Sequence, residues 1–135
     1  MQGPALNHDR LALRLPVRVE SAGIGRRAAA QFAEETGCTP ATIWRVRLAV
    51  SEAVSNVVLH AHPPGDADRQ HLTLLAEADG VHVRITISDA GAGLRARTDS
   101  PGMGLGLSLI ANSCAELALD TGRTGGTVVR MTFVR

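Results

Sequence analysis

The chain of 135 residues has the length of one compact domain, with 44% apolar residues, 20% charged residues and a formal net charge of +1. This composition excludes an intrinsically disordered chain, and the charge argues neither for nor against a polyanionic partner. One Trp, two Phe and no Tyr leave few platforms for stacking bases, so we expect no direct nucleic-acid partner. No apolar run approaches the roughly 18 residues that a membrane span needs, which predicts a soluble cytoplasmic protein.

Two further classes are excluded by residue content. All 14 basic residues are Arg, and a P-loop ATPase needs a Lys in G-x-x-x-x-G-K-[ST]. Cys38 and Cys114 are far apart and form no C-x-x-C, so neither a zinc site nor a redox motif is indicated. We expect both to be free thiols.

The chain begins with an expected flexible segment, residues 1–10, followed by one domain over residues 11–135. From Leu11 to Val19, apolar and polar residues alternate with period two, which predicts a half-buried strand. Pro16 cannot donate to a strand ladder, so this strand should lie at a sheet edge.

Two helices are predicted next. Residues 24–35 have the pattern of an amphipathic helix that ends at Gly37, a plausible C′ residue. Thr39 and Pro40 are typical of the N-cap and first position of a second helix, which should run to about His60. The apolar stripe of this second helix predicts a core position.

The C-terminal half mixes strands with one helix. A hairpin is predicted from strands at 71–78 and 81–87 with an Asp79-Gly80 turn. Residues 90–100 have no periodicity and predict a mobile loop over a site, and helical spacing follows from Leu105 to Cys114. Two more strands, near 117–121 and 129–133, complete an α+β pattern rather than repeated βαβ units.

Glu52 and Asn56 lie one turn apart in the second helix, and positions i and i+4 share a helix face. Alone, such a pair fits an ordinary solvated face. As a functional pair, the Asn oxygen can bind Mg²⁺ and the Glu carboxylate can act as a base or orient water. Phosphoryl transfer needs groups in both of these roles.

Asp89-Ala90-Gly91-Ala92-Gly93 directly follows a predicted strand. A turn with glycines at positive φ is one interpretation. In the other, the Asp89 carboxylate accepts a hydrogen bond from the exocyclic amine of adenine, while Gly91 and Gly93 let the backbone pass close to the base.

Gly102-Met103-Gly104-Leu105-Gly106 opens the third predicted helix. Position 107 is Leu, so the dinucleotide fingerprint G-x-G-x-x-G is not met. The N–H groups of a glycine-rich helix start can instead receive a triphosphate, although a flexible helix entry would have the same pattern.

In this order, the three motifs resemble the N box and the two glycine boxes of the Bergerat-type (GHKL) ATP-binding fold. The stretch from Glu52 to Ala61 looks most like the small anti-sigma factors with serine kinase activity, whose N box reads E-A-V-x-N-x-x-x-H-A. The likeness extends to the Gly126-Thr127 pair before the last strand. It implies a two-layer α+β sandwich with a mixed, mainly antiparallel sheet and helices on one face.

The resemblance also implies ATP and Mg²⁺ as cofactors and a role for each site residue. Glu52 would be the general base or water-orienting residue, Asn56 the Mg²⁺ ligand, and Asp89 the adenine anchor that Thr127 supports. Arg26, on the first helix, matches an arginine that contacts protein partners. The remaining ATP-binding residues would be Gly91 and Gly93 around the base, and Gly102, Met103, Gly104, Leu105 and Gly106 around the phosphates.

Two functions are compatible with this site. As an enzyme, the domain would phosphorylate a Ser or Thr of an anti-anti-sigma partner with a STAS fold, and would then hold its sigma factor. As a binding module, it would use ATP only to order residues 90–100 and capture a partner. Glu52 favours the enzyme, since binding alone needs no base. A histidine kinase is not expected, because about ten residues precede the first strand; a homodimer remains open.

Overall fold

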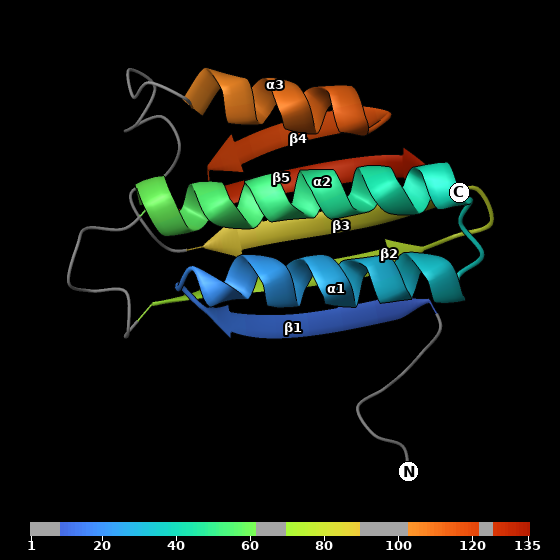
Figure 1. The fold of residues 1–135 in the computed structure, drawn as a ribbon, viewed down its shortest axis with the longest axis horizontal. Helices are drawn as coiled ribbons and strands as arrows, with labels where there is room; N and C mark the ends of the chain where they lie inside the picture. The colour runs from blue at the N-terminus through green and yellow to red at the C-terminus, as the bar shows by residue number, and fades with distance from the viewer. Residues whose placement is uncertain (1–8, 62–69, 90–102, 122–125) are drawn as a thin grey trace, which may run out of the picture.

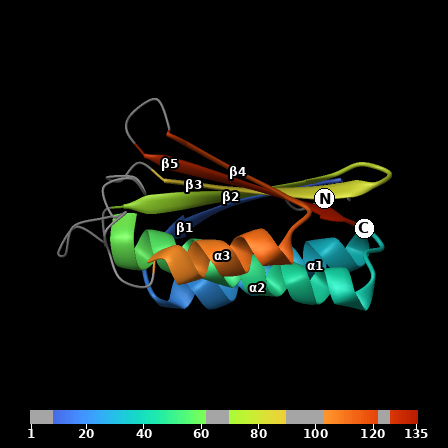
Figure 2. The ribbon, with the colours of Figure 1, turned by 90° about the horizontal axis from the view of Figure 1, so that it is seen from above.

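The computed structural model describes residues 9–61, 70–89, 103–121 and 126–135. Within these residues the chain forms a two-layer α+β sandwich, in which one face of a five-stranded sheet carries the helices (Figures 1 and 2). The predicted fold class is therefore confirmed. The elements in chain order are β1 (Arg10–Pro16), α1 (Glu20–Glu35), α2 (Pro40–Asn56), the π-helical turn η1 (Val57–Ala61), β2 (His71–Ala78), β3 (His82–Asp89), α3 (Met103–Ser113), β4 (Glu116–Thr121) and β5 (Thr127–Val134).

The strand order is β1-β2-β3-β5-β4, and each pairing among the described strands is antiparallel, in a sheet that was expected to be mixed but mainly antiparallel. β1 lies at an edge, as Pro16 predicted. The buried side of the sheet is visible in the register, because residues that face each other across strands are apolar: Leu15 and Leu72, Leu74 and Ile87, and Ile85 and Met131.

The first strand is shorter than predicted, and the first helix starts earlier. β1 ends at Pro16, and Val17 makes one further strand-like hydrogen bond, from its N–H to the carbonyl of Gln70 at 3.0 Å. The chain then reverses, so Val19 is 75% exposed at the N-cap of α1 rather than inside a strand. The alternation of apolar and polar residues continues past the last strand-pairing residue. Periodicity alone therefore placed the end of the strand too late.

α2 is the central helix of the helical layer, as its apolar stripe predicted. It packs between α1 and α3 and covers the middle of the sheet (Figures 1 and 2). Its sheet-facing side chains recur at helical spacing and are fully buried, which is how an amphipathic helix gains its stability. These include Val46, Ala49, Val50 and Val54.

The α1–α2 connection has the capping chemistry that the sequence predicts. Gly37 has φ of 88° and its N–H donates to the Glu34 carbonyl at 3.0 Å, while the Cys38 N–H donates to Ala33 at 3.0 Å, which together form a Schellman motif. The Thr39 hydroxyl oxygen accepts from the Thr42 N–H at 3.2 Å. Local sequence therefore determines both helix ends here.

Replacing Gly37 by Ala should lower the free energy of unfolding by about 1 kcal/mol, because a Cβ disfavours positive φ. Urea unfolding measures the change. Gly25→Ala is the matched control inside α1: its Cβ would meet side-chain atoms of Leu15, Val54 and Leu74 at 3.5 Å, an ordinary contact. Alanine favours helix, so this control should be neutral or stabilising. Equal effects of the two changes would contradict the capping argument.

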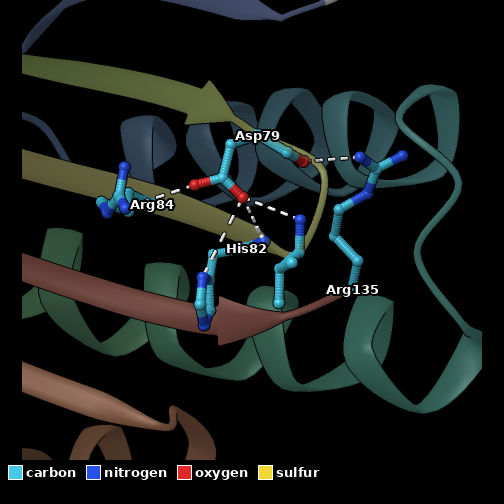
Figure 3. A network of polar contacts seen from close by, with 5 residues as sticks. Asp79, His82, Arg84 and Arg135 are labelled. Atoms are coloured by element: carbon cyan, nitrogen blue, oxygen red, sulfur yellow. Dashed lines mark hydrogen bonds and ion pairs between the residues drawn. The ribbon is translucent and has the colours of Figure 1, made fainter.

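Asp79 organises the β2–β3 turn at the end of the sheet where β2 stops (Figure 3). Its Oδ1 accepts from the N–H groups of Val81 at 2.8 Å and His82 at 2.7 Å, and its Oδ2 lies 3.3 Å from Nη2 of Arg84. Arg135 donates to the Asp79 carbonyl at 2.6 Å. The backbone N–H groups of His82 and Val81 hold the pKa of Asp79 below its ordinary value, and Arg84 adds to this.

This lowered pKa predicts a pH dependence of folding. The ionised carboxylate stabilises the folded chain above the unfolded-state pKa, about 4, and this contribution is lost as the pH falls through the folded-state value. The urea midpoint of the wild-type chain should therefore decrease more steeply below about pH 4 than that of Asp79→Asn. Parallel pH profiles for the two proteins would contradict this role of Asp79.

Candidate functional site

Four chain segments that are distant in sequence meet at one end of the sandwich. β3 ends there, β5 begins there, α2 passes into η1 there, and α3 begins there, all at the left of Figure 1. This end is opposite to the β2–β3 turn that Asp79 organises. The predicted site residues of the described chain can be placed against these segments.

Asp89 and Thr127 come together through strand pairing. β3 and β5 are antiparallel neighbours, and their last registered pair is Ser88 with Val128. Asp89 and Thr127 are the next residues on each strand, so the register places them side by side. Thr127 is 5% exposed, and Oδ2 of Asp89 is buried. The register therefore makes Thr127 a neighbour of Asp89 on the adjacent strand, and its support of the Asp89 carboxylate stays a prediction.

Glu52 and Asn56 lie on the side of α2 that faces α3. Arg45 of α2 lines a hollow together with Ser113, at the end of α3, so this side of α2 is turned toward α3. Glu52 follows Arg45 by seven residues, two helical turns, and thus shares its face. Asn56 follows one turn later and is buried at 7% exposure, while Glu52 is half-buried. Helix periodicity therefore places the pair on the side of α2 that is turned toward α3.

A π-helical turn immediately follows Asn56 and was not predicted. The sequence indicated one continuous helix to about His60, but η1 spans Val57–Ala61. The Val57 N–H is directed at two carbonyls, those of Ala53 and Val54. Single π-turns are frequent at functional sites. The residues of η1 continue the helical apolar stripe, so the spacing carries no signal that separates an α-turn from a π-turn.

α3 begins at Met103, so Gly104, Leu105 and Gly106 form its first turn. This confirms that the glycine run opens a helix. The backbone N–H groups of that turn are the ones a helix leaves without internal partners, and they favour an anion. The predicted loop at 90–100 and three predicted site residues, Gly91, Gly93 and Gly102, lie outside the described residues.

The structure does not bring Arg26 to this site. Arg26 lies in α1 and lines a hollow with Trp44 and Arg47, on the side of α2 that faces α1. Glu52 lies on the other side. A partner that contacts Arg26 would therefore meet the helical layer and not the space between α2 and α3.

The two cysteines are free thiols, as predicted. Burial raises the pKa of the Cys114 thiol, whose Sγ donates to the Ile110 carbonyl at 3.1 Å. The thiol is therefore protonated at neutral pH and is a poor nucleophile. Among the described helices, none is long and apolar enough to cross a membrane.

Comparison with known sequences agrees with this arrangement. A profile of the histidine kinase-like ATPase domain matches residues 15–133. The serine-protein kinase RsbW of Listeria monocytogenes serotype 4a is 32% identical over 80 residues, which are 59% of this chain and 51% of that protein. RsbW of Listeria innocua serovar 6a is 37% identical over 57 residues, which are 42% and 36% of the two chains. The chain thus spans about half the length of the first of these relatives.

Two solved structures share the fold. The RsbU and RsbW domains of Rv1364c from Mycobacterium tuberculosis superpose with a TM-score of 0.69 at 23% identity, covering 93% of this chain and 33% of that one. A chain of the SiaB–SiaC complex from Pseudomonas aeruginosa gives a TM-score of 0.67 at 14% identity, covering 91% and 88%. The profile match extends over most of the residues, with the fold and motif order expected of GHKL proteins, and the chain belongs to the histidine kinase-like ATPase domain family.

Proposed function

We propose that this chain is an ATP-dependent protein kinase of the anti-sigma type. It would phosphorylate a Ser or Thr of an anti-anti-sigma partner with a STAS fold, and would thereby control the sequestration of a sigma factor in the cytoplasm. The observation that carries the proposal is that α2, which carries Glu52 and ends at Asn56, β3, which ends at Asp89, and the start of α3 all lie at one end of the sandwich. Residues 11–135 would form the ATP-binding domain.

The residues present fit Mg-ATP. Asp89 supplies a carboxylate with a buried oxygen at a strand end, which suits an exocyclic amine better than a solvated cation. Asn56 supplies a neutral amide oxygen at 7% exposure, a ligand type that Mg²⁺ accepts beside phosphate oxygens. The N-terminal turn of α3 supplies N–H groups toward an anion. Base, cation and phosphate each meet a suitable group.

Asp89 would orient the nucleotide by accepting a hydrogen bond from its base, and Thr127 would support that carboxylate from the neighbouring strand. Met103, Gly104, Leu105 and Gly106 would hold the phosphates at the helix start. Gly91, Gly93 and Gly102 would complete the binding segments on either side. When bound, Mg-ATP would supply the γ-phosphoryl group, with ADP as the leaving group.

Glu52 would act on the acceptor hydroxyl. One turn before Asn56 and half-buried, its carboxylate can accept the proton that the Ser or Thr hydroxyl loses as its oxygen bonds phosphorus. Positioning by Asn56 and the α3 start would keep the reacting atoms in line. ATP binding without phosphoryl transfer would not need a carboxylate at position 52. Glu52 therefore supports a kinase over a regulator that only binds ATP.

The proposed partner follows from the relatives and from charge. The Listeria relatives are named serine-protein kinases, and SiaB has been solved in complex with SiaC. A phosphate added to a Ser or Thr at an interface brings a charge of about −1.5 to −2, which is costly to bury without cationic groups. Phosphorylation would thus release the partner and free the domain to bind its sigma factor, with Arg26 contacting either protein.

The test is a transfer assay with γ-³²P-ATP and Mg²⁺ against each purified STAS-domain protein of the source organism. We expect label on a Ser or Thr of at least one of them, located by mass spectrometry, and no label when EDTA removes Mg²⁺. Mg-dependent ATP binding without transfer to any of these proteins would overturn the kinase and leave a non-catalytic, ATP-dependent binding regulator.

A further inference from the structure

The side of α2 and η1 that borders α1 and the solvent carries large apolar side chains in exposed positions. On this side the one charged residue is Arg47, whereas Arg45 and Glu52 lie on the side of α2 that faces α3. Trp44, the single Trp of the chain, is 60% exposed at one end of this face, and Leu59 is 67% exposed at the other. The full set is Trp44, Arg47, Leu48, Ser51, Ser55, Val58 and Leu59.

Beside this face, α1 and α2 leave two hollows. The first, of about 280 Å³, is lined by Arg26 of α1 and by Trp44, Arg47, Leu48 and Ser51 of α2. Its lining combines two guanidinium groups with an exposed indole, which are side chains enriched where proteins bind each other.

The second hollow, of about 90 Å³, lies toward the candidate nucleotide site. It is lined by Val19 and Ala22 at the start of α1 and by Ser55, Val58 and Leu59. α1 and α2 run antiparallel, so the two hollows follow one another along the same helix pair (Figure 1). We call the two together the α1–α2 groove; it has a basic end and an apolar end.

At the basic end, guanidinium groups lie close together and form no ion pair with another described residue. The guanidinium groups of Arg26 and Arg27 both lie over Gly23, where a Cβ would stand 3.5 Å from Nη2 of Arg26 and 3.2 Å from Nη1 of Arg27. None of the ion pairs between described residues includes Arg26, Arg27 or Arg47. Clustered guanidinium groups of this kind are complementary to carboxylates.

We infer that the α1–α2 groove binds an amphipathic, acidic helix of the partner protein, with its carboxylates at the Arg26–Arg47 end and its apolar side chains against Val19 and Leu59. The inference rests on the proposed function, since a protein kinase must dock its substrate or its regulatory target. The groove and the nucleotide site lie on opposite sides of α2. A partner protein can therefore occupy the groove while the nucleotide site holds ATP.

The shape of the groove favours a helix. From Trp44 to Leu59, α2 and η1 together rise about 22 Å, which a partner helix of about 15 residues matches. Side-chain ridges of a third helix can pack between α1 and α2, with anchors at i, i+3, i+4 and i+7. A membrane surface is less suited, because the apolar residues line hollows and the chain carries a net charge of only +1.

The probe is a synthetic 18-residue helical peptide with Leu on one face and Glu along both flanks; a second peptide carries Lys at every Glu position. Binding is followed by anisotropy of a labelled peptide and by the emission of Trp44, which reports from the groove itself. We expect the acidic peptide to bind at least tenfold more tightly than the basic one and to shift the Trp44 emission to shorter wavelength.

Two groove variants, Trp44→Ala and Arg47→Glu, should each weaken binding of the acidic peptide at least tenfold. The matched controls are Val81→Ala and Arg14→Glu, which change an exposed apolar and an exposed basic side chain away from the groove and should bind as wild type. ATP titration of all four proteins should be unchanged.

The peptide inference is overturned if wild-type chain that binds ATP does not bind the acidic peptide, or if the groove variants bind it normally. It is also overturned if the wild-type chain, but not Arg47→Glu, sediments with phosphatidylserine vesicles while the peptide does not bind. Peptide binding without ATP binding would support the groove and count against the proposed function, so the two failures are distinguishable.

Discussion

ATP should bind Asp89→Asn about 10- to 100-fold more weakly than the wild-type chain. A hydrogen bond to a charged acceptor contributes about 1.5–3 kcal/mol, and each 1.4 kcal/mol is a factor of ten in affinity. The change keeps the size of the side chain but replaces one carboxylate oxygen by an NH₂ donor, which cannot accept from the adenine amine. Because Oδ2 of Asp89 is buried, water cannot easily supply the missing acceptor. Calorimetric titration with Mg-ATP measures the loss.

Two controls separate base recognition from general damage at Asp89. Asp79→Asn changes a carboxylate at the opposite end of the sheet and should bind ATP as wild type. Inosine triphosphate has a carbonyl in place of the adenine amine, so wild type should prefer ATP over it, and Asp89→Asn should lose that preference. An undiminished preference in Asp89→Asn would show that Asp89 does not contact the amine.

Glu52→Gln should lower the rate of phosphoryl transfer about 10²- to 10⁴-fold, the usual contribution of a general base. Affinity for Mg-ATP should change little, because the amide has nearly the same shape as the carboxylate and Asn56 and Asp89 are untouched. The reason is chemical: glutamine cannot accept the proton of the acceptor hydroxyl. Single-turnover transfer to the STAS-domain acceptor, with ATP affinity measured in parallel, gives both quantities.

The control for Glu52 is Glu34→Gln, which changes an exposed glutamate on α1 and should transfer at the wild-type rate. Parallel losses of transfer and ATP affinity in Glu52→Gln would assign Glu52 to nucleotide binding and remove its role as a base. A transfer rate like that of wild type would indicate that the acceptor hydroxyl loses its proton elsewhere.

Much of the fold was predictable because it depends on local chemistry. β2 spans 71–78, the range predicted from alternation, and the turn at Asp79 follows from a side chain that accepts from backbone N–H groups two and three residues on. Gly37 and the Thr39-Pro40 pair mark helix ends through preferences that act over a few residues. Each of these features depends on residues that are only a few positions apart in the sequence.

Other features depend on contacts that the local pattern does not contain. The end of β1 is set by where its ladder with β2 stops, and Val19 continues the alternation although it is exposed outside the sheet. The π-turn at Val57–Ala61 has the same apolar spacing as an α-turn. For this reason, periodicity placed the beginning of α1 too late and did not indicate the π-turn.

By itself, the sequence determined which groups are available: a Glu–Asn pair one turn apart, an Asp after a strand, and glycines at a helix start, in the order of one ATP-binding family. Only the tertiary structure decided how they meet. Pairing of β3 with β5 sets Asp89 beside Thr127, and the position of α2 between α1 and α3 turns Glu52 to one side and Arg47 to the other. This arrangement is favoured because it buries the apolar faces of the sheet and the helices against each other. Those contacts join segments that are far apart in the sequence, so the local pattern of residues does not reveal them.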